Sequence, residues 1–179
     1  MDWIPPMEPI TTKILISGPE WTHQIKWDGI RGMVYYESHG DFDPSGSAEG
    51  SLHIFTKNRR DRTRFYPELH HLKDRIRGKS AVLDGEMVVL GEDGRPAFQR
   101  SLIRERVSNP DRLGYYTREH PVAYILFDIL YLNGHPLTGL PLKQRGEILC
   151  RTVEVEDGFN LAVTDDFTDS RGLFDLMKK

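Results

Sequence analysis

The chain has 179 residues, enough for one domain or a large part of a two-domain protein, and its 38% hydrophobic and 28% charged residues are typical of a globular fold. The net charge of −3 excludes an overall field that draws the chain onto nucleic acid, so such binding needs a local basic patch. One cysteine excludes an internal disulfide and suits a reducing cytosol, and no window approaches 18 apolar residues, which excludes a membrane-spanning helix.

A proline-rich strap, residues 1–19, leads into two stretches of alternating polarity, 21–27 and 30–36. Asp28-Gly29 lies between them, and Asp-Gly between alternating runs predicts a β-hairpin because both residues tolerate positive φ. A period of two then places side chains on opposite faces: Gln24, Lys26 and Asp28 on one, Ile25 and Trp27 on the other. The bland interpretation is an ordinary hairpin with solvated charges.

A polar loop, residues 39–50, precedes a short strand at 52–56, and a basic segment follows at 57–64. The segment has five basic residues and one acid in eight positions, enough to bind several phosphates. A solvated turn explains the same charges equally well. The basic residues are Lys57, Arg59, Arg60, Arg62 and Arg64.

A helix is predicted from Pro67 to Gly78, followed by an apolar strand at 81–90 that contains Asp84-Gly85-Glu86. Alternation places both carboxylates on one face, and burying them costs several kcal/mol unless they are paired or bind a ligand. Gly85 permits close approach of a backbone or ligand. A functional site is favoured here over a structural salt bridge.

The remaining elements are helices at 97–107, 141–152 and 170–179, a buried strand at 122–132 and a brief strand at 161–163. Asp128 lies inside the buried strand and therefore implies a partner. The acidic segment 154–169 is interpreted as a solvated face, and the histidines show no metal-ligand spacing. Strands and helices in this irregular order predict an α+β fold with mixed, mainly antiparallel sheets and packed helices.

Four segments together resemble the motifs of the covalent nucleotidyltransferases, and among these the ATP-dependent DNA ligases. Lys26 to Arg31 matches Lys-x-Asp-Gly-x-Arg, and Asp84-Gly85-Glu86 matches the Asp-Gly-Glu strand. Residues 124–134 resemble the aromatic strand with Phe-Asp, with one extra residue after Tyr124, and Thr56 to Arg60 is a looser match. The resemblance covers nearly the whole chain and is greatest to the ligase component of bacterial end-joining systems.

The resemblance implies a role for each matched residue. Lys26 attacks the α-phosphorus of ATP and holds AMP, which is then passed to a DNA 5′-phosphate, and Mg²⁺ neutralises developing phosphate charge. Gln24 lies where the family usually has a glutamate that reads the adenine amine, and its amide oxygen still accepts that bond. The implied ATP-binding residues are Gln24, Ile25, Arg31 at the ribose and nick end, Glu86 at the ribose, and Phe127 stacked on adenine. The metal ligands are unknown.

The sequence also departs from the family. The fourth motif with its metal-binding glutamate, the fifth motif with two lysines, and the OB-fold domain have no match in residues 1–179, and Lys178-Lys179 resemble the end of the helix before the fourth motif. The chain is therefore expected to be the N-terminal part of an adenylation domain that does not seal nicks and that adenylates itself poorly or not at all.

Two alternatives stay open: an RNA ligase or capping-type nucleotidyltransferase, and a non-catalytic nucleotide- or DNA-binding remnant. The resemblance implies nicked or broken double-stranded DNA as partner, a DNA-end-binding protein of an end-joining system as a second candidate partner, and no membrane. It implies a cytoplasmic, nucleoid-associated location in a bacterium.

Overall fold

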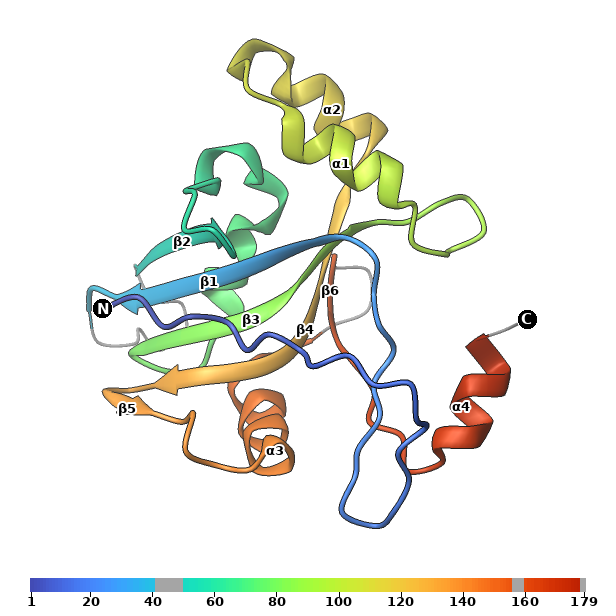
Figure 1. The fold of residues 1–179 in the computed structure, drawn as a ribbon. Helices are drawn as coiled ribbons and strands as arrows, with labels where there is room; N and C mark the ends of the chain where they lie inside the picture. Colours follow the sequence, from blue (N-terminus) through green and yellow to red (C-terminus); the bar gives the residue numbers. More distant parts are fainter. Residues whose placement is uncertain (41–49, 156–159, 178–179) are drawn as a thin grey trace. The chain divides into compact units, whose positions relative to one another are not determined.

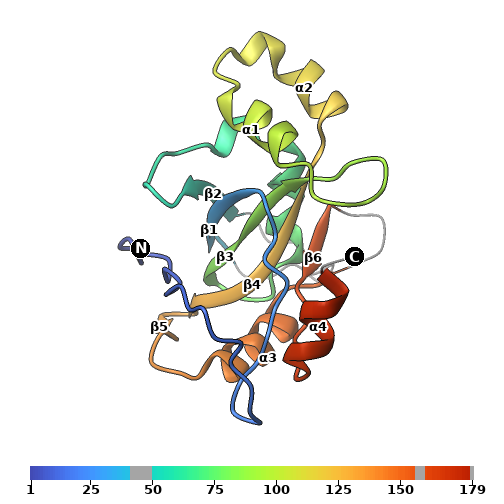
Figure 2. The same ribbon diagram turned by 45° about the vertical axis from the view of Figure 1, so that its right-hand side comes forward.

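The computed structural model describes residues 1–40, 50–155 and 160–177 (Figures 1 and 2). The chain divides into two compact units. Residues 1–6 and 27–163 form the first unit, and residues 7–26 and 164–179 form the second. Each unit is described by itself.

The first unit is built on a six-stranded sheet with the order β2-β1-β3-β4-β5, and β6 pairs with β4. In the part of the chain that the structure describes, β6 lies parallel to β4, whereas the other named strand pairs are antiparallel. The predicted α+β class is confirmed. The strands are β1 (Ile30–Ser38), β2 (Gly50–Thr56), β3 (Ser80–Val89), β4 (Val122–Leu132), β5 (His135–Pro136) and β6 (Leu161–Val163).

Helices were expected where most of them occur, with two omissions, the short 3₁₀ helix at 63–65 and the segment 110–119. The helix that begins at Pro67 is a 3₁₀ helix, and the segment 110–119 holds two helices that the sequence analysis left out. Asn109 caps the first of these through its side chain and Pro110 occupies its first turn, which is a recognisable start signal. The helices are η1 (Thr63–Phe65), η2 (Pro67–Arg75), α1 (Phe98–Arg106), η3 (Pro110–Arg112), α2 (Leu113–Glu119), α3 (Leu142–Thr152) and α4 (Ser170–Met177).

The two faces of the sheet bury different clusters, because side chains of a strand alternate between faces. On one face, Leu69 and Leu72 of η2 and Leu149 of α3 join the larger core. On the other face, a smaller cluster packs against Trp3 and Ile4 of the N-terminal strap. The smaller cluster consists of Met33, Tyr35, Val82 and Leu130.

Strand β4 contains two irregularities that matter for the site. Its register against β3 shifts between Val82 and Leu83 and again between Asp84 and Gly85. As a result Leu130 and Phe127 of β4 have no directly opposite residue on β3. Such a bulge bends a strand and changes the direction of a side chain.

The predicted hairpin at Asp28-Gly29 is wrong. β1 begins at Ile30, and both of its edges are taken, by β2 and by β3, so residues 21–27 have no edge of β1 to pair with. Neither Asp28 nor Gly29 has the positive φ that a two-residue hairpin turn requires. That turn forms instead at Asn133-Gly134, with φ of 49° and 92°, between β4 and β5.

In the second unit, His23 and Phe167 exchange two backbone hydrogen bonds of 2.9 and 2.8 Å and so join its two chain segments. Helix α4 confirms the last predicted helix as far as residue 177, while Lys178 and Lys179 lie outside the described residues. The loop at 41–49 and the acids at 156 and 157 also lie outside them. Among the described residues, no helix has the length and apolar character needed to cross a membrane.

Candidate functional site

Arg31 and Asp84 form a bidentate ion pair on the sheet face of the smaller cluster. Arg31 Nε donates to Asp84 Oδ1 at 2.5 Å, and an Nη donates to Oδ2 at 2.6 Å. The Asp84 side chain is 1% exposed and that of Arg31 is 22% exposed. Burial raises the pKa of Asp84 above its usual value, and the guanidinium opposes that shift. The pair therefore explains how one of the two predicted carboxylates is tolerated inside the sheet.

Phe127 lies against the same arginine. The Arg31 guanidinium carbon is 4.6 Å from the centre of the Phe127 ring, a cation–π distance. Phe127 is one of the two unpaired positions of β4, so the bulge is what directs its ring toward Arg31. The structure thus brings together two residues that are 96 positions apart in the sequence, both of them predicted site residues.

Glu86 is opposite Arg31 in the register of β1 and β3. It is half-buried, and its Oε1 accepts the backbone N–H of Gly29 at 3.2 Å. A Cβ at position 29 would lie 2.3 Å from the backbone oxygen of Met87. The glycine of the Asp-Gly pair therefore permits the segment before β1 to lie close to β3, and it does not form a turn.

Gly85 has a similar role, as predicted. A Cβ there would lie 2.7 Å from the ring of Tyr124, whose hydroxyl donates to the backbone oxygen of Gly32 at 2.8 Å. Sequence analysis did not assign a role to Tyr124. It is fully buried and supports the strands that carry Arg31 and Glu86 from the opposite face.

Asp128 has the partner that its position implied. Arg145 of α3 donates to both carboxylate oxygens, at 2.7 and 2.8 Å, and the side chains are 4% and 9% exposed. This pair joins α3 to the sheet. No feature of the sequence marks Arg145 as the partner, because its charge resembles that of any exposed helical arginine.

Gln24, Ile25 and Lys26 belong to the second unit. Lys26 is exposed and Ile25 is half-buried. The amide nitrogen of Gln24 donates to Asp166 Oδ1 at 2.8 Å. A carboxylate can only accept, so this contact fixes which end of the amide faces Asp166 and leaves the Gln24 oxygen as an acceptor elsewhere. Asp166 is a contact that the sequence analysis missed.

The basic segment divides into exposed and buried residues. Lys57, Arg59, Arg60 and Arg64 are exposed, and the Arg59 guanidinium lies 5.3 Å from the centre of the Trp3 ring. Arg62 is 1% exposed and does not reach the surface. It pairs with Glu105 at 3.2 Å and donates to the backbone oxygen of Val107 at 2.9 Å. Arg62 therefore does not bind phosphate, contrary to the prediction, and instead holds the basic segment against α1.

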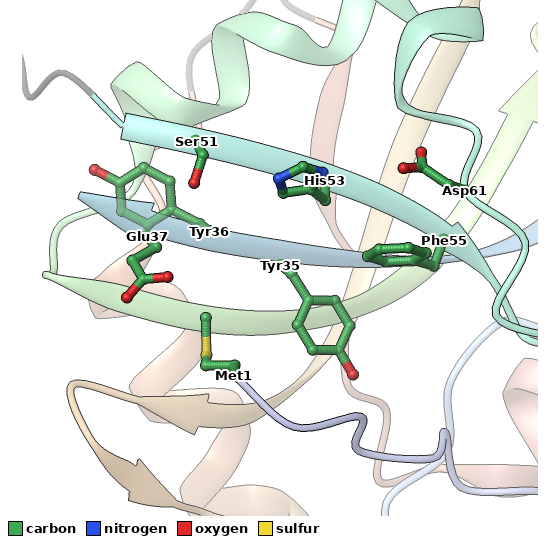
Figure 3. A pocket seen from close by; sticks show the side chains of 8 residues that line it. All are labelled: Met1, Tyr35, Tyr36, Glu37, Ser51, His53, Phe55 and Asp61. Carbon is green, nitrogen blue, oxygen red and sulfur yellow. The ribbon is translucent and has the colours of Figure 1, made fainter. Parts of the chain in front are cut away.

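A pocket of about 370 Å³ lies on the sheet face that carries Arg31 and Asp84, over the later part of β1 and its neighbour β2 (Figure 3). Figure 3 shows the rings of His53 and Phe55 side by side on β2, with Tyr35 of β1 below them. Glu37 and Asp61 contribute carboxylates, and among the residues that the structure describes no lysine or arginine lines the pocket. The lining therefore does not suit a polyphosphate, and none of the predicted ATP-binding residues belongs to it.

Among the described residues, no three His, Cys, Asp or Glu side chains gather as metal ligands. A preformed metal cage is therefore not part of the site in residues 1–40, 50–155 and 160–177. Magnesium is usually held by one or two carboxylates together with substrate phosphates, so it does not require such a cage.

Comparison with known proteins gives concordant matches. A family model described as ATP dependent DNA ligase domain matches residues 6–179. A probable DNA ligase of Saccharopolyspora erythraea is 34% identical over 153 residues, which cover 85% of this chain and 26% of that protein. The multifunctional non-homologous end joining DNA repair protein LigD of Mycobacterium tuberculosis is 29% identical over 134 residues, 75% of this chain and 15% of the relative.

The fold has a matching solved structure. Mycobacterial DNA ligase D complexed with ATP and MES superposes with a TM-score of 0.52 at 27% identity, covering 81% of this chain and 39% of that one. The chain thus spans a quarter or less of the length of some of its relatives and less than half of this structure. Because the family model covers almost every residue, the chain belongs to the ATP dependent DNA ligase domain family.

Proposed function

We propose that this chain supplies the adenylation chemistry of an ATP-dependent DNA ligase, with Lys26 as the residue that receives AMP. The observation that carries the proposal is the cluster of Arg31, Asp84 and Phe127. Three residues from three strands, each at a position of the family's motifs, meet on one face of the sheet. Glu86 adjoins them through the register of β1 and β3.

The cluster offers the groups that a nucleoside needs. A half-buried aromatic ring provides a stacking surface, and base stacking contributes about 1–3 kcal/mol. Glu86 offers a carboxylate oxygen for a ribose hydroxyl. The guanidinium of Arg31, fixed on one edge by Asp84, is held in place for a phosphate or ribose oxygen on another. The ion pair thus acts as the support that orients Arg31.

The reaction at Lys26 is a displacement at phosphorus. The lone pair of a neutral Nζ forms a bond to the α-phosphorus of ATP, the bond to the pyrophosphate oxygen breaks, and Nζ loses a proton to solvent. The reaction needs the neutral amine, and deprotonating an ordinary lysine at pH 7 costs about 4–5 kcal/mol. Magnesium, carried in on the ATP phosphates, would reduce their negative charge.

Gln24 and Asp166 account for the choice of base. Adenine presents an amine donor where guanine presents a carbonyl acceptor. A free amide can rotate to satisfy either, but the Asp166 carboxylate holds the Gln24 nitrogen, so that the amide oxygen remains for the ligand. We infer that this contact makes Gln24 an acceptor and so restores the adenine preference that a glutamate would give.

The proposed DNA partner is a nicked or broken duplex. The exposed residues Lys57, Arg59, Arg60 and Arg64 offer four positive charges to its phosphates. An end-joining role, with a DNA-end-binding partner, is proposed because LigD is among the relatives. A DNA substrate also implies a cytoplasmic, nucleoid location.

The test is transfer of label from α-labelled ATP to the chain. We expect weak covalent label on the unaltered chain and equal label on Lys143→Ala, an exposed lysine of α3 that serves as the control. We expect none on Lys26→Ala. Equal labelling of Lys26→Ala excludes Lys26 as the nucleophile. Labelling from GTP instead of ATP selects a capping-type enzyme, and absence of any label selects a non-catalytic binding protein.

A further inference from the structure

Residues 95–118 carry an excess of positive charge. This segment contains α1, η3 and α2 and has six arginines against two acids, Glu105 and Asp111, in a chain whose net charge is −3. The function proposed above assigns no role to it. Figures 1 and 2 show α1 and α2 next to each other at one end of the sheet.

Two charged residues of this segment, Arg104 and Glu105, form ion pairs inside the protein. Arg104 is fully buried, pairs with Glu68 at 2.7 Å and donates to the backbone oxygen of Phe65 at 2.9 Å. Glu105 is neutralised from the other side by Arg62, with Arg60 at 3.8 Å. These contacts fix α1 to η2 and to the basic segment. The exposed arginines of 95–118 are therefore carried by elements that are held in place. Glu105 is already paired with Arg60 and Arg62.

A pocket of about 250 Å³ lies within this segment. Arg106 and Arg112 line it, both exposed, together with the polar side chains of Ser108, Asn109 and Tyr116. Two guanidinium groups, a serine and a tyrosine hydroxyl are hydrogen-bond donors that match the oxygens of a phosphate group. Asp111 is exposed nearby in the sequence, and Asn109 Oδ1 accepts its backbone N–H at 2.9 Å.

The register of the sheet places this pocket's segment at the same end as the candidate site. β3 ends at Val89, three residues after Glu86, and Val89 pairs with Val122 at the start of β4. Three residues of a strand span about 10 Å. Thr56, the last residue of β2, is opposite Gly32, so the basic segment 57–64 begins at this end too.

We propose that the pocket between α1 and α2 binds a backbone phosphate of duplex DNA and forms one continuous surface with the exposed basic segment. Glu105 joins the two parts, because Arg60 and Arg62 of the basic segment both contact it. The assignment of the bound phosphate to DNA, and not to a free anion, rests on the proposed function. It adds a second contact point on the duplex, on a different element from the motif residues.

The experiment measures binding of a labelled nicked duplex to the 179-residue chain across a series of salt concentrations. In Arg106→Ala/Arg112→Ala we expect the slope of log affinity against log salt to fall by about 1–2, since each lost phosphate contact removes about 0.9. The matched control is Arg77→Ala/Arg151→Ala, which removes the same charge from two exposed arginines elsewhere in the first unit. The control keeps the slope of the unaltered chain.

Equal slopes in the two double variants overturn the proposal, because general charge then explains the binding. Inorganic phosphate, titrated in parallel by amide chemical shifts at residues 106–112, separates a DNA site from a small-anion site. Saturation by phosphate with no binding of duplex contradicts the DNA assignment, and no response to either ligand contradicts the pocket itself. Failure of the proposed adenylation is recognised separately, as absence of label from ATP in a reaction without DNA.

Discussion

The sheet contains two Asp–Arg pairs that are alike in chemistry and different in setting. Asp84 and Asp128 are opposite each other on β3 and β4, and each is bound by two nitrogens of one arginine. Like charges opposite each other destabilise a sheet, so each aspartate needs its own cation. Arg145 is 9% exposed, whereas Arg31 is 22% exposed and also contacts Phe127.

The difference in exposure distinguishes the structural pair Asp128–Arg145 from the pair Asp84–Arg31, for which we propose a functional role. Arg145 also donates to the backbone oxygen of Leu140, so its donors serve the protein interior. The hydrogen bonds to Asp128 raise the pKa of Arg145, which stays charged. The Arg31 side chain is 22% exposed on the face that carries the motif residues. The same pair of residue types therefore holds a helix in one place and, under the proposed function, orients the arginine that binds the nucleotide in the other.

The largest expected effect is on stability, at the structural pair. Arg145→Ala leaves Asp128 buried without a cation and should lower the free energy of unfolding by about 3–5 kcal/mol. Urea denaturation measures it. Arg151→Ala, on the same helix and exposed, should cost less than about 0.5 kcal/mol. Equal losses in the two variants contradict the structural role.

Arg31→Ala should cost less, about 2–3 kcal/mol at neutral pH, because water reaches this pair more readily. The loss depends on pH. Burial raises the folded-state pKa of Asp84, and the variant lacks the guanidinium that opposes this shift. The folded state of the variant then binds the Asp84 proton more tightly than the unfolded state does. The stability cost of Arg31→Ala is therefore smallest below the unfolded-state pKa of Asp84 and grows as pH rises through its folded-state pKa. Denaturation between about pH 4 and pH 8 tests this, and a loss that does not vary with pH argues against it.

Phe127→Ala tests the ligand-binding part of the comparison. Loss of a stacking ring should weaken ATP binding by about 1–3 kcal/mol, while Tyr115→Ala, an exposed aromatic of α2, leaves it unchanged. Isothermal titration measures both. Unaltered ATP affinity in Phe127→Ala would show that the adenine does not stack on this ring.

The smallest expected effect concerns base selection in the second unit. Asp166→Ala releases the Gln24 amide, which can then turn either end to the ligand, so the preference for ATP over GTP should fall by about 1 kcal/mol, or five- to tenfold. Asp165→Ala, an exposed neighbour, is the matched control. A similar loss in both variants assigns the effect to general negative charge.

The sequence predicted most of the elements of the sheet, because β3 and β4 are long apolar runs in which each acid is conspicuous. Asp128 implied a partner, yet Arg145 could not be named, since a helical arginine shows no sign of burial. The prediction for Arg62 was wrong for the same reason. In the sequence it is one of five similar cations, and only the structure shows that it is buried and contacts Glu105 and the carbonyl of Val107.

The Asp28-Gly29 prediction failed for a different reason. Glycine occurs both in turns and where two backbone segments approach closely, and the sequence pattern alone does not distinguish these two uses. At position 29 the backbone of Met87 is the neighbour, and at Asn133-Gly134, where the true turn occurs, the sequence has the same kind of signal. The bulge at Phe127 could not be predicted either, because it depends on pairing with β3.

The most direct measurement is to locate the nucleotide on the chain. After incubation with ATP, proteolysis and peptide mass spectrometry should find AMP on the peptide that contains Lys26, and the adduct should disappear in Lys26→Ala. An adduct on another lysine, or on none while ATP is consumed, would contradict the account.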